Sequence, residues 1–184
     1  MGKIRLLLYC TKSRYRLFYD YIDNKYKYGL DGKKDKFNAF NGKIVAECDF
    51  EVEEIRLTKG LYLDEEYITN KLREKEVLKY SCLSYREFAD YVGSKGYAIH
   101  IKNLNIFDKA RELREYAMLK EGFFTTIKNA PQNMMKAYRY DYEKAKLGNY
   151  ILISIRPEWL CKILNGEKTI EVRKKVLKEM ITDA

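Results

Sequence analysis

The segment that most restricts the fold is residues 150–173, near the end of the chain. Residues 151–155, ILISI, form a short apolar run, which is typical of a buried strand. Pro157 and Gly166 then frame a helix, because proline favours the first helical position and glycine the position after the last turn. Residues 168–173, KTIEVR, alternate in polarity, which predicts a second strand. The segment therefore predicts a strand–helix–strand unit.

The rest of the chain predicts further strands and few helices. Residues 4–10 form a second short apolar run, and residues 43–57 alternate apolar with acidic side chains, so we expect a strand in each. Residues 97–107 are a further expected strand. A capping box that starts at Ser84 predicts a helix near residues 84–93. This pattern predicts an α+β fold with a small mixed sheet or barrel and two or three short helices.

Three other segments have weaker patterns. Residues 108–118 are expected to form a short helix with Asp108 as its cap. Residues 11–42 show no clean period and predict a long loop or an irregular hairpin insertion. Residues 139–149 are polar and are expected to be a linker.

The net charge of +9 favours a polyanionic partner such as nucleic acid. The charge is unevenly distributed along the chain. Residues 47–67 hold eight acids against two bases, whereas residues 156–178 hold seven bases against three acids. One face is therefore expected to be basic and another acidic.

The four cysteines lie far apart in the sequence, and the chain has one histidine. This spacing does not fit a zinc site, so we expect no metal, no cofactor and reduced thiols in a cytoplasmic protein. The longest apolar runs are about five residues, against the roughly 20 that cross a membrane. No membrane partner is expected.

Residues 154–174, SIRPEWLCKILNGEKTIEVRK, resemble the opening motif of ASCH domains, a branch of the PUA-like superfamily. The family pattern is a strand, a helix and then G-x-K-x-x-E-x-R, which stands here as Gly166, Lys168, Glu171 and Arg173. The resemblance implies a PUA-like β-barrel. Other stretches resemble the family's remaining strands; they are residues 6–12, 41–55, 96–116 and 128–135.

The motif comes first in the family and last here, so the chain resembles a circularly permuted ASCH domain or the remnant of a tandem pair. In this interpretation residues 1–138 are the body of the barrel, residues 139–149 the linker, and residues 150–184 the piece that completes it. That piece could close within its own chain, giving a monomer, or complete a neighbouring chain, giving a domain-swapped dimer.

The resemblance implies that Lys168, Glu171 and Arg173 line a cleft. Strand period places Glu171 and Arg173 on one face, about 7 Å apart along the strand and close enough for an ion pair. Arg173 could bind phosphate through two parallel hydrogen bonds. The alternative is a solvated ion pair on an exposed strand, which contributes little.

Three more residues are candidate ligand-binding positions. His100 lies near the cleft by the resemblance, although a lone histidine is more often a sheet residue with satisfied hydrogen bonds. Gln132 sits in APQ, where the family commonly has PPQSW, and Met134 replaces the tryptophan. Arg156 precedes the expected helix. The tyrosines and bases of residues 12–36 suit single-stranded nucleic acid, because rings stack on bases and cations meet phosphates.

The main hypothesis is a nucleic-acid-binding module, expected to bind RNA through a basic cleft. The first alternative is an ASCH-type hydrolase, either an acetylcytidine amidohydrolase or a nuclease. The amidohydrolases use a lysine, a threonine and a distant glutamate; Lys168 fits, but Glu171 stands at the threonine position and Lys79 at the glutamate. The second alternative is a phage or mobile-element factor that binds a protein through the acidic strand face at 47–54.

Overall fold

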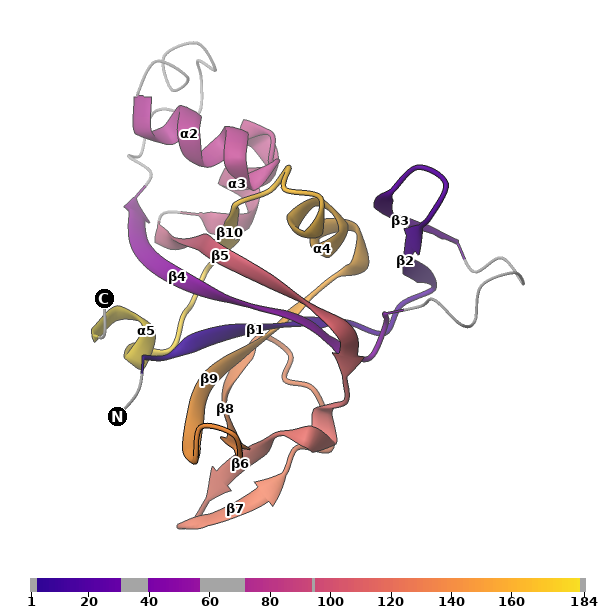
Figure 1. Ribbon diagram of the computed structural model, residues 1–184. Helices are drawn as coiled ribbons and strands as arrows, with labels where there is room; N and C mark the ends of the chain where they lie inside the picture. Colours follow the sequence, from indigo (N-terminus) through magenta and orange to yellow (C-terminus); the bar gives the residue numbers. More distant parts are fainter. Residues whose placement is uncertain (1–2, 31–39, 57–71, 94, 183–184) are drawn as a thin grey trace. The chain divides into compact units, whose positions relative to one another are not determined.

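The computed structural model describes residues 3–30, 40–56, 72–93 and 95–182 (Figure 1). In this part of the chain the strands are β1 (Arg5–Cys10), β2 (Tyr15–Asp20), β3 (Lys25–Leu30), β4 (Ile44–Arg56), β5 (Lys95–Arg111), β6 (Ala117–Lys120), β7 (Phe123–Thr126), β8 (Met134–Asp141), β9 (Lys146–Ile155) and β10 (Ile170–Arg173). The helices are α2 (Leu72–Ser81), α3 (Tyr85–Val92), α4 (Pro157–Leu164) and α5 (Lys178–Thr182), with a 3-10 turn at Leu113–Glu115.

Eight of the described strands join in a mixed sheet in the order β10-β5-β4-β1-β9-β8-β6-β7, and β2 pairs with β3. The expectation of a strand-rich fold with short helices is confirmed. The expectation of a barrel is wrong, because β10 and β7 stand at the two ends of the strand order and the sheet does not close. Alternating polarity could not distinguish the two cases, since strands of open and closed sheets share the same period.

The chain divides into two compact units. Unit 1 comprises Met1–Asp49 and Asn103–Asn165, and unit 2 comprises Phe50–Lys102 and Gly166–Ala184. The long strands β4 and β5 contribute residues to both units.

Unit 1 is built around β1, whose residues Leu6–Cys10 are all buried. β1 pairs antiparallel with β4 and parallel with β9, where Leu6 lies opposite Ile151. β9 pairs on its other side with β8, so the apolar run at 151–155 is an interior strand of this unit. A strand that is buried on both faces requires a continuous apolar sequence. The apolar runs of β1 and β9 meet this requirement.

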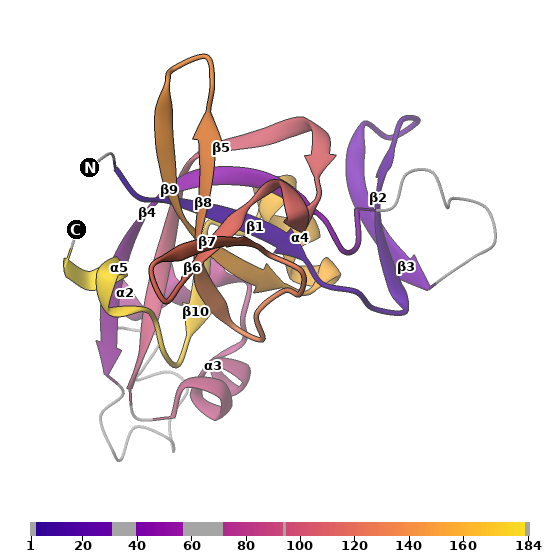
Figure 2. The same cartoon turned by 90° about the horizontal axis from the view of Figure 1, so that it is seen from below.

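α4 follows β9 as predicted, with Pro157 at its start. Its buried side chains include Leu160, Ile163 and Leu164, which recur at helical spacing. The helix lies beside the β2–β3 hairpin in both views (Figures 1 and 2). The predicted strand–helix–strand unit is therefore confirmed as β9, α4 and β10.

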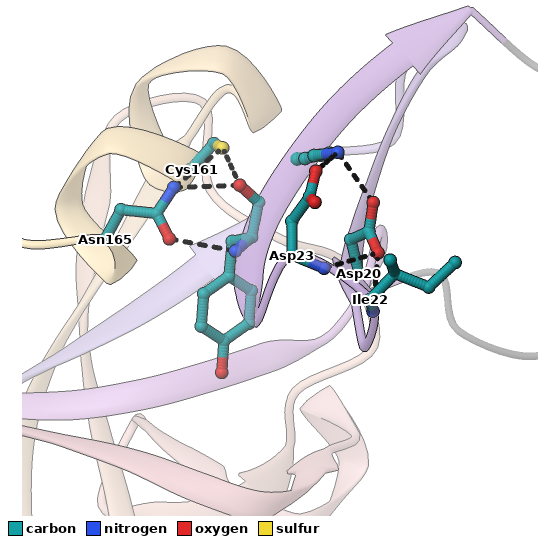
Figure 3. A network of polar contacts seen from close by, with 7 residues as sticks. Asp20, Ile22, Asp23, Cys161 and Asn165 are labelled. Carbon is teal, nitrogen blue, oxygen red and sulfur yellow. Dashed lines mark hydrogen bonds and ion pairs between the residues drawn. The ribbon is translucent and has the colours of Figure 1, made fainter.

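The sequence predicts a long loop or an irregular hairpin for residues 11–42; residues 15–30 form the β2–β3 hairpin, which pairs in unbroken register, while residues 31–39 lie outside the described residues. The side chain of Asn165 pairs with the backbone of Tyr26: the Tyr26 N–H donates to Asn165 Oδ1 at 2.8 Å, and Asn165 Nδ2 donates to the Tyr26 carbonyl at 2.8 Å. Figure 3 shows this pairing beside the hairpin turn, where Asp20 accepts from the Ile22 N–H at 2.9 Å. The residue after α4 thus anchors the hairpin.

The expectation of a linker at residues 139–149 is wrong. These residues complete β8, turn, and begin β9, with Asp141 opposite Lys146, so they form the end of a long hairpin (Figure 2). Asp141 Oδ1 closes the turn by accepting from the backbone N–H groups of Glu143 at 3.0 Å and Lys144 at 3.2 Å. Both faces of this end are largely exposed, so its sequence carries no apolar stripe.

The helix expected at residues 108–118 is also wrong. β5 continues through Asp108 to Arg111, and a single 3-10 turn and β6 follow. The charged residues at 108–118 have the composition of a polar helix when they are considered alone. Helix propensity is a weak preference, and the tertiary structure of the folded chain overrides it.

Unit 2 packs α2 and α3 on its parts of β4, β5 and β10. Its core consists of apolar side chains from all these elements: Ile55, Val77, Phe88, Ala89, Val92, Ala98, Ile170 and Val172. The predicted capping box is present, since Ser84 Oγ accepts from the Glu87 N–H at 3.2 Å and Glu87 accepts from the Ser84 N–H at 2.8 Å. β10 pairs antiparallel with β5, with Ile170 opposite His100.

Candidate functional site

The three motif residues Lys168, Glu171 and Arg173 form one connected cluster in unit 2. Lys168 Nζ lies 3.3 Å from Glu171 Oε2, and Arg173 Nε donates to Glu171 Oε1 at 2.8 Å. Lys168 is 3% exposed and Glu171 is 8% exposed. The expected Glu171–Arg173 ion pair is therefore present, but it is largely buried and not solvated.

Lys168 also holds the end of α2. Its ammonium donates to the carbonyl of Ser81, the last residue of that helix, at 2.7 Å. The last carbonyls of a helix have no partner within the helix and carry partial negative charge, so an ammonium is a favourable partner there. The next residue continues the attachment, because the Thr169 N–H donates to the Tyr80 carbonyl at 2.9 Å.

Burial lowers the pKa of Lys168 below its ordinary value, and the negative charge of Glu171 opposes this effect. These contacts satisfy structural needs: Lys168 ties α2 to β10, and Glu171 compensates the charges of Lys168 and Arg173. A phosphate that bound Lys168 Nζ or Arg173 Nε would have to displace the buried carboxylate of Glu171.

His100 lies on β5, in the strand next to the motif. Its Nε2 is 3.0 Å from Glu53 Oε2. Both line a pocket of about 600 Å³ in unit 2, the acidic pocket, together with Glu51, Val52, Glu76, Val77 and Lys102. Lys102 pairs with Glu51 at 2.7 Å. Three carboxylates against one lysine and one histidine make this pocket unfavourable for a phosphate.

Gln132 and Arg156 belong to unit 1, not to the unit that holds the motif cluster. Both are exposed. Arg156 precedes α4, and its carbonyl accepts from the Leu160 N–H at 2.9 Å, while its side chain makes no cap hydrogen bond. Neither side chain lines the acidic pocket or the two pockets of unit 1 described next.

Unit 1 has a pocket of about 280 Å³ that sequence reasoning missed, and we name it the basic pocket. Its basic lining residues are Lys3, Arg5, Arg111, Arg139, Lys144 and Lys146, and its acidic ones are Glu47 and Asp141. Leu147, Gly148, Asn149 and Tyr150 on β9 complete it. The bases come from the segment before β1 and from β1, β5, β8, the β8–β9 turn and β9, so no local motif could have revealed the pocket.

The arginines of the basic pocket are held in place by neighbours. Arg5 Nη1 lies 2.8 Å from Glu47 Oε1, and Arg5 Nε donates to Asp49 Oδ1 at 3.2 Å. Arg111 Nη1 donates to the Tyr116 hydroxyl at 2.8 Å, and its guanidinium carbon lies 3.8 Å from the centre of the Phe107 ring. Arg5 Nη2 also donates to the Asn103 carbonyl at 3.5 Å, so all three nitrogens of Arg5 have partners within the protein. A guanidinium that is fixed by one neighbour, as Arg111 is by Tyr116, is suited to bind phosphate oxygens.

A second pocket of unit 1, of about 710 Å³, lies between the segment after β1 and the segment before β8. Lys12, Arg114 and Lys128 line it against one acid, Glu112. Burial, followed by the nearby Cys10 and Glu112, raises the pKa of Tyr9 in its wall. In both of these pockets of unit 1, basic lining residues outnumber acidic ones.

Comparison with protein-family models, curated proteins and solved structures finds no match to this chain. Among the described residues no group of three or more His, Cys, Asp and Glu side chains could hold a metal ion. In the same part of the chain, no helix has the length and apolar character needed to cross a membrane. The four cysteines are free, and burial raises the pKa of Cys10 and of Cys48 to about 12.

Proposed function

We propose that this protein is a nucleic-acid-binding module that binds RNA through the basic pocket of unit 1. The observation that carries the proposal is the lining of this pocket, where six Lys and Arg side chains stand against two carboxylates. Phosphate contacts supply most of the affinity of nucleic-acid-binding proteins, and arginine and lysine are the side chains that make them.

Two further observations support this assignment. The whole chain carries a net charge of +9, which favours association with a polyanion. The resemblance of residues 154–174 to ASCH domains favours RNA as the nucleic acid and a PUA-like origin of the fold. The proposed site differs from the cleft expected from that resemblance, because Glu171 compensates the motif cations Lys168 and Arg173.

The test is a fluorescence anisotropy titration with labelled single-stranded RNA, duplex RNA and single-stranded DNA at several salt concentrations. The variant is Lys144→Glu with Lys146→Glu, since both lysines are exposed and line the basic pocket. If both contact phosphates, the slope of log affinity against log salt should fall by about two, roughly one for each lost contact.

The matched control is Lys109→Glu with Lys120→Glu, two exposed lysines of unit 1 that do not line the basic pocket. Both double variants change the net charge by the same amount, so a general charge effect would weaken binding equally. Selective loss in the pocket variant supports the proposal. Equal loss in both variants, or no binding by the parent protein, overturns it.

A further inference from the structure

The charges around the basic pocket do not cancel. Its six cations face Glu47 and Asp141 in the lining, and two carboxylates outside it pair with lining arginines: Asp49 with Arg5 at 3.2 Å and Glu115 with Arg139 at 4.0 Å. Six cations against four carboxylates leave an excess of two positive charges. A terminal phosphate carries about 1.5 to 2 negative charges at neutral pH, as phosphorylated side chains do. A phosphodiester of the backbone carries one, so the excess fits a terminal phosphate better.

One wall of the basic pocket is aromatic. Tyr150 is half-buried and packs edge-to-face on Tyr116, with ring centroids 5.7 Å apart. Burial, followed by the nearby Glu47, raises the pKa of Tyr150, so its hydroxyl stays protonated and can donate at neutral pH. Gly148 leaves room for this ring, because a Cβ at that position would lie 2.6 Å from the Tyr150 hydroxyl oxygen.

The ring of Tyr150 is the part of this wall that a base can contact. Successive side chains of a strand point to opposite faces of the sheet, so the side chain of Asn149 points away from the face that carries Tyr150. On the Tyr150 face, Arg5 lies opposite Tyr150 and Arg139 opposite Gly148. Stacking on an aromatic ring tolerates every base, because every base has a π-face. The pocket is therefore expected to accept adenine and uracil alike.

The size of the pocket limits its ligand. Small-molecule sites commonly measure about 300 to 1,000 Å³. At about 280 Å³ the basic pocket is just below this range, which suits at most one nucleotide and not a run of stacked bases or a duplex.

We propose that the basic pocket binds a single nucleotide through a terminal phosphate, with the phosphate at Arg111 and Arg139 and the base beside Tyr150. The nucleotide is either the phosphorylated end of an RNA strand or a free nucleoside monophosphate. This inference rests on the proposed function, because the same pocket serves both.

The test has two arms. In the first, anisotropy compares one single-stranded RNA with a 5′-phosphate, a 3′-phosphate or hydroxyls at both ends. In the second, calorimetry measures binding of adenosine monophosphate, uridine monophosphate, adenosine and inorganic phosphate. We expect a phosphorylated end to bind about tenfold or more tightly than a hydroxyl end, the change expected from one charge-assisted hydrogen bond. Adenosine monophosphate should bind about tenfold or more tightly than adenosine, because only the monophosphate carries the terminal phosphate.

Two variants link these preferences to the pocket. Arg139→Gln should remove the preference for a terminal phosphate, and Tyr150→Leu should weaken binding of adenosine monophosphate and uridine monophosphate alike, because it removes the ring that stacks on the base. Lys120→Gln is the control, since this exposed lysine does not line the pocket, and thermal melting checks that each variant is folded.

The outcomes separate the inference from the proposed function. If RNA binds equally with and without a terminal phosphate and no free nucleotide binds, the inference is overturned and the proposed function stands. If adenosine monophosphate binds and no RNA does, the inference holds for the free nucleotide and nucleic-acid binding fails. If no ligand binds, both are overturned.

Discussion

Replacing Lys168 by methionine separates a structural role of the motif from a ligand-binding one. Methionine keeps a long unbranched stem in the buried space but removes the ammonium that donates to the Ser81 carbonyl at 2.7 Å. It also removes the contact at 3.3 Å with Glu171. If Lys168 ties α2 to β10, the variant should be less stable than the parent protein and should bind nucleic acid equally well.

The expected size of the loss follows from what remains after the substitution. Removing one partner of a buried ion pair costs about 3–5 kcal/mol when the other charge is left alone. Glu171 is not left alone here, because Arg173 Nε still donates to it at 2.8 Å. The main cost is therefore the unsatisfied Ser81 carbonyl, about 1–3 kcal/mol. We expect a decrease of about 1–3 kcal/mol in the free energy of unfolding.

Urea unfolding followed by far-ultraviolet circular dichroism measures this decrease. Hydrogen exchange at the amides of Thr169 and Ile101 shows whether the loss of stability lies where α2 meets β10. The Thr169 N–H donates to the Tyr80 carbonyl and the Ile101 N–H donates to the Thr169 carbonyl. Lys174→Met is the matched control, because Lys174 is exposed just after β10. Its ammonium lies 5.5 Å from the centre of the Tyr91 ring, so we expect a change of at most about 1 kcal/mol.

The opposite pattern would refute this reasoning. If Lys168→Met is as stable as the parent and exchange at both amides is unchanged, the ammonium does not hold α2. If the same variant also loses RNA affinity while Lys174→Met does not, the motif lysine is part of the binding site, as the family resemblance implied.

Two further predictions follow from contacts in each unit. Burial lowers the pKa of Lys168, so the unfolded chain binds more protons than the folded protein between that lowered value and the ordinary value of 10.5. The parent should therefore gain stability relative to Lys168→Met as pH rises towards 10.5, and a difference between their unfolding free energies that stays constant with pH would contradict this. In unit 1, Asn165→Ala removes two hydrogen bonds of 2.8 Å to the Tyr26 backbone. Exchange of the Tyr26 N–H should accelerate about fivefold or more, and unchanged protection would show that other contacts hold the hairpin.

The sequence predicted those elements whose local signals agree with their place in the fold. The apolar runs at 4–10 and 151–155 are the buried neighbours β1 and β9. Pro157 begins α4, and Ser84 caps α3 with a complete capping box. Burial requires the apolar residues of the two strands, and the ends of the two helices favour proline and serine. These same residue types made the four elements recognisable in the sequence.

Other elements depend on pairing partners that the sequence does not reveal. Residues 139–149 form a hairpin whose two faces are both largely exposed, so they have the polar composition of a linker. Residues 108–111 extend β5 although their charged side chains favour a helix locally. The open ends of the sheet at β10 and β7 follow from strand order, which periodicity does not encode.

The candidate site shows the same division. Strand period predicted the Glu171–Arg173 pair, because the two residues lie two positions apart on one strand. It could not predict that Ser81, 87 positions before Lys168, accepts from the motif lysine. The basic pocket was not visible, because strand pairing brings Arg5, Arg111 and Arg139 together from distant parts of the chain.

The position of the carboxylates, more than the number of bases, decides where a chain of net charge +9 can bind a polyanion. Lys168 and Arg173 share Glu171, which is 8% exposed, so a phosphate that bound them would leave a buried carboxylate without its partners. Such an unpaired buried charge is costly. In the basic pocket the cations outnumber the carboxylates near them, so a phosphate can bind the other cations while Glu47 and Asp49 stay paired with Arg5. Nucleic-acid affinity should therefore respond to substitutions at Arg139 and Lys146 and be insensitive to substitutions in the motif.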